Sequence, residues 1–68
     1  SEFMESLLSS NIFPIVRVRM GGFGSYHYVT VVGSQDGNFL CMDPLGDGET
    51  LTPLSRFGNR VYAVRFLV

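Results

Sequence analysis

Apolar and polar residues alternate along several short stretches of the chain, and this alternation predicts strands. In residues 12–20, Val16 and Val18 alternate with Arg17 and Arg19, so one face of the stretch is apolar and the other polar, as in a half-buried strand. Three further stretches are rich in β-branched and aromatic residues, which favour pleated sheets. They predict strands at residues 26–32, 39–43 and 61–68.

The segments between these strands carry turn and short-helix signals. Residues 5–10 predict one or two helical turns, residues 49–52 a short strand, and residues 53–57 a helical turn that has Pro53 at its first position. The glycine-rich stretch at 21–24 predicts a turn. The expected fold class is therefore α+β and mostly β: a small antiparallel sheet of four to five strands with short helical turns.

The length of 68 residues limits the chain to one domain with a small core. Six Phe and three Tyr supply more apolar surface than such a core uses, so we expect part of it to contact a partner. Residues 1–3 precede Met4 and are interpreted as an expression-tag remnant. Residues 4–68 then form a single β-rich domain.

Composition and charge argue against several classes of function. The net charge is −1 and the five arginines form no basic run, so we expect no nucleic-acid partner. No apolar run approaches the roughly 20 residues of a membrane span, and no signal-peptide pattern is present; we expect a soluble, cytoplasmic protein. One His and one Cys do not make a metal site, and the glycine-rich stretch lacks the lysine of a phosphate loop, so we expect neither metal nor cofactor.

The single histidine, His27, begins one predicted strand, and Asp43 ends the next. Side chains on a strand alternate between its two faces, so the loop between the strands decides whether these two meet. An odd loop sets His27 directly opposite Asp43, whereas a two-residue turn at Asp36 and Gly37, the commoner hairpin signal, puts them on opposite faces. A base and an orienting acid at these positions therefore require an odd loop or a β-bulge.

The succession of "PIVRV", a glycine-rich loop, "HYVTVVG" and "DPLG" is similar to the C-terminal half of papain-like cysteine peptidases of the bacteriocin-processing type, which cleave double-glycine leader peptides. The resemblance covers residue 7 to the C-terminus. It implies that His27 is the general base, that Asp43 holds its ring, and that the substrate is a peptide. It also implies that residues 4–68 form the β-lobe of a larger papain-like domain.

The family's nucleophilic cysteine and its oxyanion glutamine belong to a preceding half, and this chain has neither. Cys41 lies in the middle of a predicted strand and is interpreted as an inert core thiol. Ser25 is a weaker candidate nucleophile and is interpreted as a loop serine. Gln35 lies in the predicted hairpin turn and does not fit the oxyanion role. The isolated chain is therefore expected to be inactive.

Three hypotheses follow for the function. The chain is the His/Asp lobe of a cysteine peptidase, or a catalytically dead module that binds a peptide or protein, or a structural β-domain that oligomerises. In the first case its partner is the Cys-bearing half. Without that half, we expect Val29, Val31 and Phe39 to lie on an exposed apolar face, and self-association into a homodimer or larger assembly to cover it.

Overall fold

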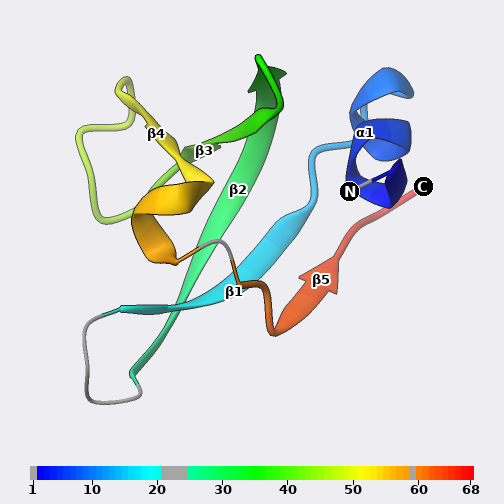
Figure 1. Cartoon of the computed structure of the whole chain (residues 1–68). Helices are drawn as coiled ribbons and strands as arrows, with labels where there is room; N and C mark the ends of the chain where they lie inside the picture. The colour runs from blue at the N-terminus through cyan, green and yellow to red at the C-terminus, as the bar shows by residue number, and fades with distance from the viewer. Residues whose placement is uncertain (1, 21–24, 59) are drawn as a thin grey trace.

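The strands of this protein form an antiparallel sheet, shown in Figure 1 of the computed structural model. The structure describes residues 2–20, 25–58 and 60–68. Within them the sheet has five strands in the order β4-β3-β2-β1-β5. The elements in chain order are α1 (Glu2–Ser9), β1 (Ile15–Met20), β2 (Ser25–Gln35), β3 (Asn38–Met42), β4 (Leu51–Pro53), the 3₁₀ helix η1 (Leu54–Phe57) and β5 (Ala63–Arg65). The predicted mostly-β fold with a small antiparallel sheet is confirmed.

The bounds of several elements differ from the prediction. β2 extends to Gln35 because the β2–β3 hairpin closes through a two-residue turn, with φ of 52° at Asp36 and 82° at Gly37. Positive φ at both positions gives the turn the twist that hairpins favour. α1 begins at Glu2 and includes residues interpreted above as a tag remnant. The predicted glycine-rich turn at 21–24 lies outside the described residues.

One face of the sheet carries the core, and we name it the inner face. Val16, Val18, Val29, Val31 and Cys41 point to it and are at most 1% exposed. Met4 of α1 and Leu54 of η1 complete this buried cluster. Val29 and Val31 are buried in the same cluster as these two residues, and Phe39 packs partly buried against it. The expectation of an open apolar face here is therefore wrong.

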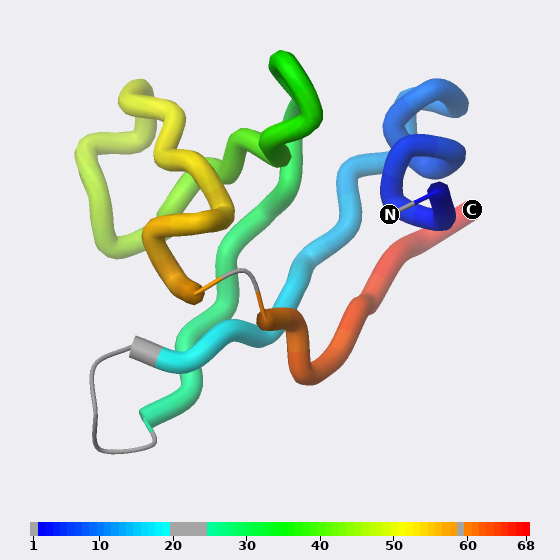
Figure 2. Tube along the Cα trace, in the orientation of Figure 1, coloured from blue at the N-terminus to red at the C-terminus, as the bar shows by residue number. Residues whose placement is uncertain are grey.

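The connection from β4 to β5 explains how η1 reaches the core. β4 and β5 are the two edge strands, so the chain must cross the sheet between them, as the trace in Figure 2 shows. η1 contacts both β3 and β1 on the way. Gly58 then ends η1 with a positive φ of 85°, and its N–H donates to the carbonyl of Ser55, a helix ending that favours glycine.

The opposite face of the sheet, which we name the outer face, carries several exposed side chains. Alternation along β1 and β2 places there Ile15, Arg17, Arg19, Tyr26 and Tyr28. Ile15, Tyr26 and Tyr28 are 45%, 53% and 48% exposed. Part of the excess apolar surface expected from the composition thus lies on this face.

Candidate functional site

His27 and Asp43 form a direct side-chain contact on the inner side of the sheet. His27 Nε2 lies 2.7 Å from Asp43 Oδ1, and the two side chains are 10% and 20% exposed. A contact of this length between an imidazole and a carboxylate is in the range of a charge-assisted hydrogen bond. The two residues singled out from the sequence are therefore brought together.

A β-bulge makes this contact compatible with the two-residue turn. On the side of the hairpin next to the turn, Gly33 pairs with Leu40. One step further from the turn, Val31 pairs with Cys41, so Val32 is the extra residue on β2. The shift of one residue reverses the alternation and returns His27 and Asp43 to the same face. Because Thr30 pairs with Met42, Asp43 comes level with Val29, and His27 is its diagonal neighbour rather than its direct opposite.

A tight turn directly after β3 fixes the Asp43 carboxylate. The N–H of Leu45 donates to Asp43 Oδ1 at 2.9 Å, and the N–H of Gly46 donates to the Asp43 carbonyl at 2.9 Å. Aspartate followed by proline favours such turns. A Cβ at Gly46 would lie 3.2 Å from the Asp43 carbonyl oxygen, so the turn favours glycine there. The Leu45 N–H, and then the bond from His27, hold the pKa of Asp43 below its ordinary value.

The lowered pKa of Asp43 decides which nitrogen of His27 carries the proton. An ionised carboxylate only accepts hydrogen bonds, so in the neutral ring Nε2 donates to Asp43 and Nδ1 keeps its lone pair. No further hydrogen bond to the ring comes from the described residues. The Phe57 ring of η1 lies beside the imidazole, with 6.0 Å between ring centroids. The arrangement leaves Nδ1 as the atom able to accept a proton.

This tautomer is a testable prediction. In ¹⁵N NMR spectra of the neutral ring, we expect the proton on Nε2 in the wild type. Asp43→Asn loses the charge that holds Nε2–H, so we expect a mixture of tautomers or a shift towards Nδ1–H. Asp47→Asn is the matched control, because Asp47 accepts its hydrogen bonds from Thr50 in its own loop, whereas the hydrogen-bond partner of His27 is Asp43. A wild-type ring protonated mainly on Nδ1 would contradict the geometry.

The other residues considered from the sequence do not join this pair. Cys41 is fully buried, and burial, followed by the nearby charge of Asp43, raises the pKa of its thiol to about 11. The interpretation of Cys41 as a core residue is confirmed, and a thiol with a raised pKa forms little of the reactive thiolate. Ser25 begins β2 and is exposed. Gln35 ends β2, eight residues from His27, which is about 26 Å along a strand.

Asp47, four residues after Asp43, forms its hydrogen bonds within its own loop. Asp47 accepts hydrogen bonds from the N–H of Glu49 and from both the N–H and the hydroxyl of Thr50. These bonds, with Thr50 contributing most, lower the pKa of Asp47 to about 2.

Nowhere in the described residues do three His, Cys, Asp or Glu side chains gather as metal ligands. Across the same residues, no helix has the length and apolar character needed to cross a membrane.

Two contributors to the site were not found from the sequence. The Leu45 N–H follows from the aspartate–proline turn signal, because an aspartate at the start of a turn accepts a hydrogen bond from the N–H two residues later. Phe57 belongs to the predicted helical turn, but its place beside His27 depends on the crossing of η1 over the sheet. The first had a local signal in the sequence, and the second had none.

Comparisons with protein-family models, with curated proteins and with solved structures find no match to this chain.

Proposed function

We propose that this chain is the His/Asp lobe of a papain-like cysteine peptidase, in which His27 is the general base and Asp43 orients it. The observation that carries the proposal is the 2.7 Å contact between His27 Nε2 and Asp43 Oδ1. It is supported by the β-bulge that produces the contact and by the resemblance of the surrounding sequence to that family. The general base and the residue that orients it are both supplied by this chain, as His27 and Asp43.

The chemistry assigned to the pair begins with proton transfer. His27 Nδ1 takes the proton from a cysteine thiol supplied by another polypeptide segment, and the resulting thiolate attacks the carbonyl carbon of the peptide bond. The proton then passes from Nδ1 to the leaving amine as the C–N bond breaks. Asp43 stabilises the imidazolium throughout, and a water molecule later hydrolyses the thioester. The chain itself contributes the base and the orienting acid.

The nucleophile must come from outside this chain in this proposal. Cys41 is excluded because its thiol is buried and its pKa is about 11. The partner is therefore a Cys-bearing peptidase half, and the substrate is a peptide with a double glycine before the cleaved bond, as the resemblance implies. Self-association into a homo-oligomer is the alternative mode of assembly.

The test is reconstitution of activity with a double-glycine peptide. We expect no cleavage by the chain alone, and thiol-dependent cleavage when it is produced together with the segment encoded directly upstream in its gene. His27→Ala should then lower kcat by at least about 10²-fold, the usual contribution of a general base. Asp47→Asn should leave kcat unchanged, since Asp47 bonds only within its own loop.

Two outcomes would contradict the proposal. Cleavage by the reconstituted enzyme that survives His27→Ala would remove His27 from the base role. An upstream segment without a cysteine, together with a chain that cleaves nothing, would remove the peptidase assignment and favour a binding or structural domain.

A further inference from the structure

Three arginines on the outer face stack on two tyrosine rings. The guanidinium carbon of Arg17 lies 4.5 Å from the centre of the Tyr26 ring, and that of Arg60 lies 5.1 Å from the centre of the Tyr62 ring. The guanidinium carbon of Arg19 lies 5.9 Å from the centre of each of the two rings. The two rings meet edge to face at 5.5 Å between centroids. We name these five residues the arginine–tyrosine cluster.

The positive charge of this cluster is not neutralised within the described chain. None of its guanidinium groups forms an ion pair there, and Arg17 Nε is buried without a hydrogen-bond partner. The carboxylates of Asp43, Asp47 and Glu5 bond elsewhere, to His27, Thr50 and Ser34. Three cations thus gather on one face of a chain whose net charge is −1.

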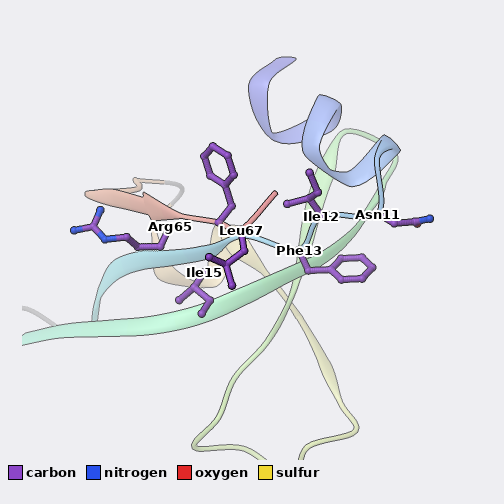
Figure 3. Close-up of a pocket in the computed structure, with 7 residues that line it drawn as sticks. Asn11, Ile12, Phe13, Ile15, Arg65 and Leu67 are labelled. Carbon is purple, nitrogen blue, oxygen red and sulfur yellow. The ribbon is translucent and has the colours of Figure 1, made fainter.

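An apolar pocket adjoins the cluster along β1. It has a volume of about 370 Å³ and is lined by apolar side chains that include Phe13, Ile15 and Leu67, with Arg65 as its cationic group (Figure 3). Ile15 pairs with Arg65 across β1 and β5, so both side chains belong to the outer face. The volume is within the range of ligand pockets, and a few polar groups among apolar walls are typical of them.

We propose that the outer face docks an acidic polypeptide segment in an extended conformation, with an apolar side chain in this pocket and carboxylates on the arginine–tyrosine cluster. Ile15, Arg17 and Arg19 follow one another at every second residue of β1, which spaces them by about 7 Å. An extended partner repeats its side chains at the same spacing. The matching segment has an apolar residue followed by acidic residues two and four positions later.

The observations favour a polypeptide over a small oxyanion. A guanidinium binds a carboxylate or a phosphate bidentately, but a phosphate ion alone would leave the apolar pocket empty. The exposed rings of Tyr26 and Tyr28 add large, rigid contact area, and tyrosine with arginine is typical of the energetic centres of protein interfaces. Stacking on the rings also holds the guanidinium groups in place, which reduces the side-chain entropy lost on binding.

This docking surface is separate from the histidine site. Val18 and His27 are paired residues that both face the inner side, whereas Arg17 and Arg19 beside them face the outer side. The proposal therefore stands or falls independently of the peptidase assignment.

The experiment is an NMR titration of the whole chain with a blocked pentapeptide that has leucine at the first position and glutamate at the third and fifth. We expect shifts at the Ile15 methyl groups and at the side-chain N–H groups of Arg17 and Arg19. The peptide with glutamines in place of both glutamates should bind more weakly by up to about 25-fold, because each of the two exposed ion pairs contributes up to about fivefold.

Matched variants locate the site. Arg19→Gln should weaken binding by up to about fivefold, and Ile15→Ser should abolish the advantage of leucine over serine at the first peptide position. Arg56→Gln is the control, because Arg56 is exposed on η1 and makes no ring contact; its affinity should be unchanged.

Three outcomes would overturn the proposal. The first is an equal loss of affinity in Arg56→Gln, which would show a non-specific charge effect. The second is displacement of the peptide by inorganic phosphate at constant ionic strength, which would indicate a small oxyanion site. The third is a sedimentation pattern in which the chain self-associates and Arg19→Gln restores the monomer, which would make the occupant a second copy.

Discussion

Leu54→Ala should lower the free energy of unfolding by about 2–5 kcal/mol, the usual cost of deleting most of a buried leucine. Leu54 is 6% exposed and brings η1 into the buried cluster of the inner face. A chain of 68 residues has a total stability of roughly 3–10 kcal/mol. The substitution therefore removes a large share of the stability, and urea unfolding followed by far-UV circular dichroism measures it.

The chain offers a matched control for this experiment. Leu45 is 78% exposed, so Leu45→Ala should change the free energy of unfolding by less than about 0.5 kcal/mol. Leu54→Met keeps the volume and should cost less than about 1.5 kcal/mol. Equal effects of Leu54→Ala and Leu45→Ala would mean that η1 does not pack on the sheet as described.

Most of what could be predicted about the fold and the candidate site followed from the alternation of side chains along the strands. It separated the apolar and polar faces of β1, and it showed that His27 and Asp43 meet only with an odd loop or a β-bulge. The structure has the bulge. The choice between these solutions was not predictable, because a bulge at Val32 depends on which faces of β2 and β3 are buried, and that is a property of the assembled sheet.

The coverage of the two faces could not be predicted from local patterns. Residues 5–10 indicated a helix too short to be stable without packing, and nothing local in the sequence indicated that this helix adds Met4 to the buried cluster of the inner face. The same holds for η1, because a four-residue helix reaches the core only through the crossing from β4 to β5. Exposed apolar surface was therefore expected on the inner face, whereas the open side chains, such as Tyr26 and Tyr28, lie on the outer face.

Alkylation of Cys41 by iodoacetamide at pH 8 should be at least about 100-fold slower in the folded protein than in the chain unfolded by urea. The thiol is fully buried, and its pKa is about 11 rather than the ordinary 9.0. The shift alone lowers the thiolate fraction about 100-fold. Because folding raises the pKa of Cys41, the contribution of this thiol to stability is fully present below the pKa of the unfolded chain and is lost as the pH rises towards 11. The alkylation rate of the folded protein should therefore increase steeply at high pH.

Combining the two substitutions separates a buried thiol from an activated one. If Cys41 reacts only after unfolding, its alkylation rate follows the unfolded population, and Leu54→Ala must raise that rate by roughly the factor by which it lowers stability: about 30-fold or more for a loss of 2 kcal/mol. A nucleophile activated by His27 would behave in the opposite way, because unfolding separates it from its base. Mass spectrometry after timed quenching gives the rates, and Leu45→Ala should match the wild type. Slower alkylation in Leu54→Ala than in the wild type would make Cys41 a reactive group of the folded protein and would contradict its assignment to the core.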